Sequence, residues 1–230
     1  FLILIHIAPS LAQLPAFPGA EGFGATTTGG RGGRVIYVTN LNPDGPGSLQ
    51  AALNETGKRY ILFKVSGVIP ATMEVLPGHG DFTLAGQTSP EGVIVRGFQS
   101  YAEETPSSGN FIIRHIRSRI GDLNVNPSSS WIGADGLTLG GVHKAIIDHC
   151  SFAHASDEAV DISRSSSLTI QNSLLAETLG GHADLGGMLI NYSSSNSRLD
   201  SLSIHHNTWH RIGGRMPEIS CETQYCGGQT

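Results

Sequence analysis

The side chains best suited to chemistry in this sequence are carboxylates in one short stretch. Four of its nine aspartates fall within 27 residues, in the run ADGLTLGGVHKAIIDHCSFAHASDEAVDI. They are Asp135, Asp148, Asp157 and Asp161. Carboxylate oxygens bind hard cations, and Ca2+ accepts irregular oxygen geometry more readily than Mg2+ does. The stretch is therefore a candidate calcium site.

The alternation of side chains along a strand decides which aspartates can meet. In AVDI, Val160 and Ile162 are expected to face the core, so Asp161 faces outward, and Asp157 shares its parity. Four residues of straight strand span about 13 Å, so the chain must bend if both carboxylates bind one ion. With Asp135 supplied by the preceding turn of chain, three carboxylates can converge on one outer face. Three separate, solvated surface carboxylates are the alternative.

The composition favours a β-rich fold in a single domain. The chain has 230 residues, 30 of them glycine, and 14% are charged, against roughly 25% in ordinary soluble domains. Few side chains favour helix, which argues against a coiled coil or a helical bundle. The net charge of -5 argues against nucleic acid as a partner, because such binding depends on basic contacts to phosphate.

Four segments share one pattern of alternating apolar residues: FIIRHIRS, AIIDHCSF, LTIQNSLL and LSIHHNTW. Their third apolar residues are Ile113, Ile147, Ile170 and Ile204, at spacings of 34, 23 and 34 residues. A second set of short strands is expected between them, at 135–139, 159–162 and 187–190. Irregular repeats of this kind suit a solenoid whose turns share a core and differ in loop length. The sequence therefore predicts an all-β protein, a right-handed parallel β-helix.

A polar position follows each reference isoleucine by two residues. The four residues there are His115, His149, Asn172 and His206. In a parallel solenoid equivalent positions stack about 4.8 Å apart, so these side chains are expected to form a structural ladder between turns.

A short helix is expected near the N-terminal end of the solenoid, in GPGSLQAALNE. Ser48 is its expected N-cap, and Leu49, Ala52 and Leu53 form an apolar face. This helix would close the open end of the core, since a solenoid needs its ends covered.

Several motifs resemble the pectate lyases of polysaccharide lyase family 1. The run IIDHCSF followed by SDEAVDI resembles the signature of that family, and HHNTWHRIGGRMP is similar to its catalytic-arginine segment. The opening AFPGAEGFGATTTGGRGGRVIYVTNL is similar to that of many secreted members. Together the matches cover most of residues 16–217.

The resemblance implies a role for individual residues. It makes Arg215, in GRMP, the catalytic base, and it makes Asp148 and His149 structural residues that lock adjacent turns. The calcium ligands that it implies are Asp135, Asp157 and Asp161. A guanidinium has a pKa above about 12, so a basic role needs neighbouring charge and alkaline pH, and stabilisation of a carbanion is the alternative role.

The implied reaction is calcium-dependent β-elimination on polygalacturonate, which leaves 4,5-unsaturated oligogalacturonides. The chain departs from the family pattern in two places. Glu218 and the residues after it stand where further arginines are usual, and no lysine follows Lys144 to bind substrate. The candidates to replace that charge are Arg117, Arg119, His182 and Arg211, although each arginine could equally form a structural ion pair. A non-catalytic carbohydrate-binding or adhesin-like β-helix is therefore the alternative function.

The first residues, FLILIHIAPSLAQ, are apolar but too short to span a bilayer. Residues 1–13 are interpreted as the end of a signal peptide, with a buried strand as the alternative. This predicts a secreted protein without a membrane partner, expected to be a monomer. Residues 14–230 form the expected catalytic β-helix domain, with a C-terminal end that looks truncated. Cys221 and Cys226 could form a disulfide, and Cys150 is expected to be buried.

Overall fold

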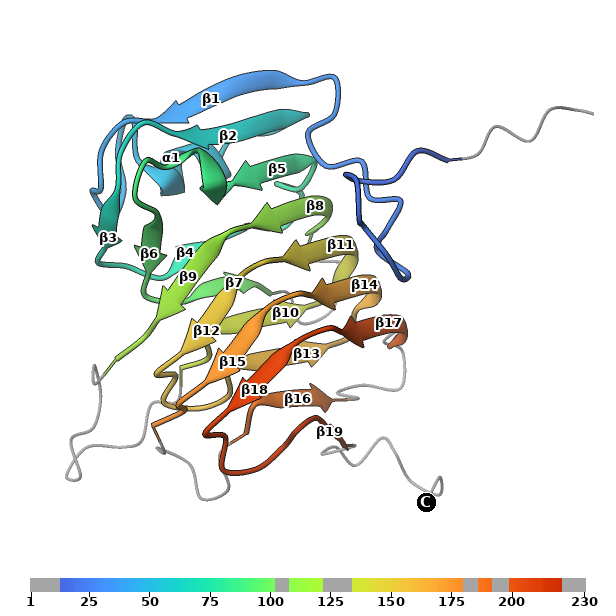
Figure 1. Cartoon of the computed structure of the whole chain (residues 1–230). Coiled ribbons are helices and arrows are strands. Elements are labelled where there is room, and N and C mark those ends of the chain that lie inside the picture. Colours follow the sequence, from blue (N-terminus) through green and yellow to red (C-terminus); the bar gives the residue numbers. More distant parts are fainter. Residues whose placement is uncertain (1–12, 102–107, 122–133, 180–185, 192–198, 221–230) are drawn as a thin grey trace, which may run out of the picture.

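The structure is a computed structural model that describes residues 13–101, 108–121, 134–179, 186–191 and 199–220. Its chain winds into a solenoid in which successive turns contribute strands to three parallel sheets (Figure 1). Sheet A has seven strands: β1 (Arg34–Val38), β2 (Arg59–Phe63), β5 (Phe82–Ala85), β8 (Ser108–Arg114), β11 (Val142–Asp148), β14 (Ser166–Gln171) and β17 (Asp200–His205).

The other two sheets have six strands each. Sheet B contains β3 (Gly67–Ile69), β6 (Val93–Val95), β9 (Ile116–Arg119), β12 (Ser151–Ala153), β15 (Leu174–Ala176) and β18 (Thr208–His210). Sheet C contains β4 (Met73–Glu74), β7 (Phe98–Ser100), β10 (Leu137–Gly140), β13 (Val160–Ser163), β16 (Met188–Asn191) and β19 (Glu218–Ser220). A short 3-10 helix, η1 (Gly86–Thr88), follows β5.

The predicted β-helix is confirmed, and so is the register of its repeats. Ile147 pairs with Ile113 on one side and with Ile170 on the other, and Ile170 pairs in turn with Ile204. Three of these isoleucines are at most 3% exposed, and Ile204 packs against the same core. Each turn therefore places an apolar side chain above its equivalent in the neighbouring turn, which is what the irregular spacing required.

The predicted polar ladder forms the corner between sheets A and B. All four of its residues have a left-handed backbone, with φ between 51° and 55°. Histidine and asparagine tolerate this conformation better than β-branched residues do, which explains their recurrence at a sharp bend. The rings of His115 and His149 stack with centroids 5.0 Å apart, so the ladder also links adjacent turns.

Asp148 lies beside this ladder and is completely buried. Its carboxylate accepts hydrogen bonds from Arg114 Nε (2.7 Å), His149 Nδ1 (2.9 Å), Gln171 Nε2 (2.8 Å) and Asn172 Nδ2 (3.1 Å). Burial alone would raise the pKa of Asp148, but these donors outweigh it and lower the pKa. Because the donors come from three turns, Asp148 locks the turns together as the resemblance implied.

The segment before β1, residues 13–33, is called the strap here because it lies across the outer face of sheet A (Figure 1). Its backbone donates hydrogen bonds to side chains of the sheet, including Glu21 N to Gln171 Oε1 and Gly24 N to Thr169 Oγ1. A Cβ atom at Gly24 would lie 2.3 Å from the carbonyl oxygen of Ala145. Glycine therefore lets the strap approach the sheet closely.

The expected end-closing helix is α1 (Leu49–Leu53), with Ser48 accepting a hydrogen bond from Ala51 N. Its C-terminal end is held by Arg59, a buried residue that no sequence pattern indicated. The guanidinium donates to the carbonyl oxygens of Ala52 and Leu53, both at 2.9 Å, and also to backbone carbonyls at residues 57, 79 and 80. The buried guanidinium of Arg59 thus makes five hydrogen bonds to backbone carbonyls in place of the hydrogen bonds it would make to water.

Cys150 is buried, as expected, and it forms no disulfide within the described part of the chain. Burial raises the pKa of its thiol to about 12. The proposed signal-peptide segment, except for Gln13, lies outside the described residues, as do Cys221 and Cys226. Within the described ranges no helix has the length and apolar character needed to cross a membrane.

Candidate active site

Three carboxylates meet at the corner where the chain passes from sheet B to sheet C. Asp135 stands just before β10, and Asp157 and Glu158 lie between β12 and β13. One oxygen of each lies within 4.8 Å of an oxygen of each of the others. Adjacent turns of the solenoid therefore bring together two of the aspartates that the sequence singled out, and they add Glu158.

Glu158 was missed because simple alternation puts it on the opposite side from Asp157. Residues 154–159 form a bend, in which alternation no longer holds, and the Glu158 side chain turns back toward the two aspartates. Its backbone N–H also donates to Asp135 Oδ1 at 3.2 Å. The only sequence signal was its position beside Asp157.

Asp161 follows the predicted parity. Val160 and Ile162 are fully buried, whereas Asp161 is partly exposed on the outer face of β13. It pairs in register with Thr138 of β10, whose hydroxyl donates to Asp135 Oδ2 at 2.8 Å. Asp161 thus stands on the turn next to Asp135, although the third carboxylate of the 4.8 Å group is Glu158.

The electrostatics of the cluster favour the addition of positive charge. Burial is the main cause that raises the pKa of Asp135, and the neighbouring Asp157 raises it further. Burial also raises the pKa of Glu158, followed by the hydrogen bond and the negative charge of Asp157. Carboxyl groups crowded in this way hold a proton unless a cation compensates their charge.

Arg215 supplies one positive charge at this corner. Its Nη1 pairs with Glu158 Oε1, and its Nε lies 3.2 Å from Glu218 Oε2. The backbone carbonyl of Arg215 accepts from Met188 N at 2.8 Å, which fixes the residue at the edge of sheet C. A Cβ atom at Gly186 would lie 2.4 Å from Arg215 Cβ, so a glycine is needed there. Arg215 and the acidic cluster therefore lie together.

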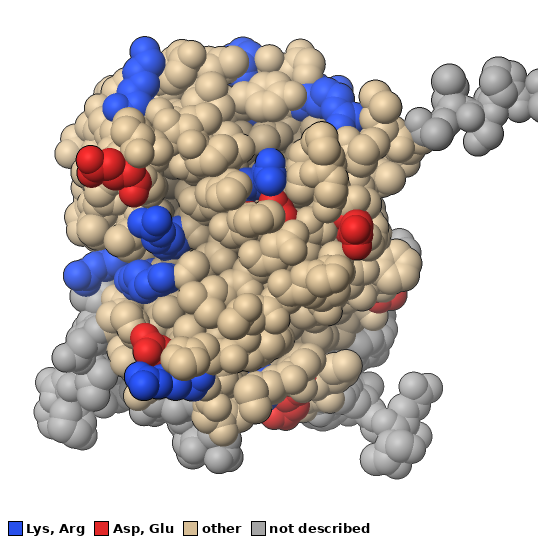
Figure 2. Space-filling view, in the orientation of Figure 1, with Lys and Arg blue, Asp and Glu red and all other residues tan. Residues whose placement is uncertain are grey.

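The three arginines predicted to bind substrate belong to sheet B or its end. Blue side chains gather over this sheet on the left of Figure 2. Arg119 donates to Ser118 O (2.7 Å), Ser151 O (2.9 Å) and Ser151 Oγ (2.6 Å), so its guanidinium is held within the fold. Arg117 is exposed on β9. Arg211 is exposed after β18 and lies 3.4 Å from Glu177 Oε1.

His182, the remaining predicted substrate-binding residue, lies outside the described residues. The geometry therefore unites Asp135, Asp157 and Arg215, leaves Asp161 beside them on the same sheet, and places the three other arginines on the adjoining sheet.

The fold and this corner define a parallel β-helix protein with an acidic cluster facing an arginine. No protein-family model matches the sequence. Among curated proteins, the chain is 37% identical over 188 residues to probable pectate lyase C of Aspergillus terreus, a match that covers 81% of this chain and 42% of that protein. It is 30% identical over 174 residues to pectate lyase 1 of Cryptomeria japonica, covering 67% and 45%.

By sequence, the chain is a relative of these pectate lyases, which confirms the resemblance drawn from its motifs. It spans less than half the length of either relative. Among solved structures, it is similar to Jun a 1, the major allergen from cedar pollen, with a TM-score of 0.61 and 20% identity. That match covers 86% of this chain and 60% of the allergen, and it supports the β-helix fold.

Proposed function

We propose that the protein is a secreted, monomeric, calcium-dependent pectate lyase that cleaves polygalacturonate by β-elimination. The observation that carries this proposal is the cluster of Asp135, Asp157 and Glu158 next to Arg215. Its relatives by sequence are named pectate lyases, which supports the same reaction. The alternative, a non-catalytic carbohydrate-binding or adhesin-like β-helix, would use the scaffold without the chemistry.

The carboxylates of Asp135, Asp157 and Asp161 would hold the calcium ion. All donors are oxygens, which is the set that Ca2+ prefers, and burial disfavours the charged form of Asp135 unless a cation is near. Glu158 is already paired with Arg215, so we assign it to orienting the guanidinium instead. When bound, the ion would withdraw electrons from the uronate carboxylate and make the C5 proton more acidic.

Arg215 is the proposed catalytic residue. Contacts with Glu158 and Glu218 favour its charged form, and a charged guanidinium can stabilise the negative charge that develops as C5 loses its proton. The same group could accept that proton only at alkaline pH, because guanidinium pKa values exceed about 12. The electron pair of the broken C5–H bond forms the C4–C5 double bond of the unsaturated product. The glycosidic oxygen leaves C4 with its bonding pair and takes a proton from solvent, and the C5 proton is released to solvent, directly or by way of Arg215.

The polyanionic substrate needs local positive charge, because the chain carries a net charge of -5. Arg117 and Arg211 are the exposed cations that we assign to binding it, together with His182. Arg119 has its guanidinium committed to Ser118 and Ser151, so we expect it to act mainly by supporting its neighbours.

The test uses polygalacturonate with calcium and follows the ultraviolet absorbance of the unsaturated product. Wild-type protein should produce the signal, and either a chelator or Arg215→Ala should abolish it. Arg34→Ala is the matched control, since Arg34, on β1, forms an exposed ion pair with Glu55. If wild-type protein binds polygalacturonate without forming unsaturated product, the binding-module alternative is correct.

A further inference from the structure

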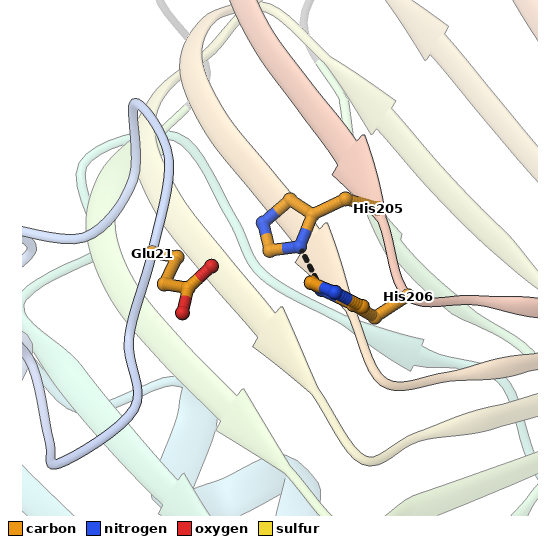
Figure 3. A group of neighbouring side chains, drawn as sticks. All are labelled: Glu21, His205 and His206. Atoms are coloured by element: carbon orange, nitrogen blue, oxygen red, sulfur yellow. Dashed lines mark hydrogen bonds between the residues drawn. The ribbon is translucent and has the colours of Figure 1, made fainter.

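A second group of metal-ligating side chains lies on sheet A, separate from the acidic cluster. Glu21 extends from the strap toward His205, the last residue of β17, and His206, the next residue along (Figure 3). One ligand atom of each side chain lies within 4.8 Å of one from each of the others. The group therefore joins Glu21 to His205, which lies 184 residues later in the sequence.

The corner geometry explains why two consecutive histidines come together. Neighbouring residues of a straight strand point to opposite faces, but His206 has a φ of 55°, which turns the chain. The two rings consequently meet edge to face, with centroids 4.9 Å apart and planes at 83°. Their Nδ1 atoms lie 2.8 Å apart in a hydrogen bond, drawn as a dashed line in Figure 3.

The preceding turn shows what an ordinary, fully bonded version of this corner looks like. Gln171 pairs in register with His205. Its side chain accepts from Glu21 N at 3.1 Å and donates to Gly19 O at 3.0 Å. By contrast, His205 Nε2 is buried and has no hydrogen-bond partner within the described part of the chain. Figure 3 shows this nitrogen on the side of the ring that faces Glu21.

A buried ring nitrogen without a partner calls for an explanation, and a bound ion is one. The neighbouring group of His115, Asp148 and His149 has no buried ligand atom that lacks a hydrogen-bond partner within the described residues. Although its ligand atoms are equally close, the Asp148 carboxylate already accepts four hydrogen bonds from nitrogen donors. A metal there would have to displace them.

We propose that Glu21, His205 and His206 bind a divalent transition-metal ion, with Zn2+ as the best fit, and that the ion fastens the strap to β17. Two imidazoles and one carboxylate form a known zinc donor set that leaves a fourth position for water. Imidazole ligands select zinc, copper or nickel over calcium, so this site and the acidic cluster would take different ions.

The ion requires only small movements of these side chains. Ligand atoms around tetrahedral zinc lie about 3.4 Å apart for bonds of roughly 2.1 Å. With the ion on His205 Nε2, the His206 ring must give up its hydrogen bond to His205 Nδ1 and turn toward the ion, and the Glu21 carboxylate must approach. Glu21 and His206 are both exposed, so neither movement disturbs the core.

The chain provides its own replacement residues for the test. The double variant His205→Gln plus His206→Asn copies Gln171 and Asn172, which occupy the same corner one turn earlier. Asn172 has a φ of 51°, so asparagine is compatible with the backbone at this corner. Glu21→Gln leaves the strap's backbone hydrogen bond in place. His210→Gln, which changes an exposed histidine on β18, is the matched control.

Untagged protein saturated with Ca2+ is titrated with ZnCl2 by calorimetry, and its thermal unfolding is measured with and without zinc. Wild type and His210→Gln should bind one Zn2+ and unfold at a higher temperature with it. Glu21→Gln and the double variant should bind at least about tenfold more weakly and lose the shift. Equal zinc binding by the double variant, or none by wild type at millimolar zinc, overturns the proposal.

Discussion

Asp148→Asn tests whether one buried carboxylate locks three turns of the solenoid. Arg114 and His149 donate to Oδ2, whereas Gln171 and Asn172 donate to Oδ1. Whichever oxygen becomes the amide NH2 then faces two N–H donors and loses both hydrogen bonds. A bond to a charged donor contributes about 1.5–3 kcal/mol and a neutral one about 1 kcal/mol. Since Arg114 and His149 keep some contact with water, we expect a loss of about 3 kcal/mol.

Urea unfolding followed by circular dichroism measures this loss at neutral pH. Glu55→Gln is the control, because the Glu55 carboxylate forms an ion pair in which both side chains are at least half exposed, and such pairs contribute about 0–1 kcal/mol. A loss in Asp148→Asn no larger than that of the control would refute the locking role.

The same variant makes a prediction about pH. Hydrogen bonds lower the pKa of Asp148 in the folded protein, so its contribution is complete above the unfolded value of about 3.9. That contribution disappears as the pH falls through the lower folded pKa. The difference in unfolding free energy between wild type and Asp148→Asn should therefore shrink as the pH falls below about 4. A difference that grows in acid contradicts this assignment.

Three further predictions concern other parts of the molecule. Arg59→Met should lower the unfolding free energy by about 3–5 kcal/mol in urea, because five backbone carbonyls lose their donor; a loss below 1 kcal/mol would contradict this. Gly24→Ala should loosen the strap and speed its proteolysis relative to Leu14→Ala, which changes a strap side chain that is 67% exposed; equal rates would argue against close packing. As the pH is lowered, calcium affinity should begin to fall at a higher pH than it would for a site made of ordinary aspartates, because Asp135 has a raised pKa and must be deprotonated to bind. Titration calorimetry at several pH values checks this.

Sequence alone was sufficient for the features that repeat from turn to turn. The isoleucine column and the histidine and asparagine ladder follow from the stacking of equivalent positions, and stacking requires only that the turns share a core. The outward direction of Asp161 was also predictable, because it lies within a strand whose neighbours are buried.

The features that sequence could not predict depend on bends and distant contacts. Glu158 joins the acidic cluster because residues 154–159 turn a corner, where alternation gives no guidance. Arg59 reads as an ordinary surface cation until the end of α1 is placed over it. The strap's hydrogen-bond partners lie as many as 180 residues away, as between Phe23 and Ser203, and no local pattern indicates that separation.

The most direct test of the proposed active site is a crystal structure grown with calcium and a short oligogalacturonate, with calcium located by anomalous scattering. The account predicts one strong peak coordinated by Asp135, Asp157 and Asp161, with a uronate between that ion and Arg215. A calcium peak away from these carboxylates, or a uronate bound far from Arg215, would contradict it.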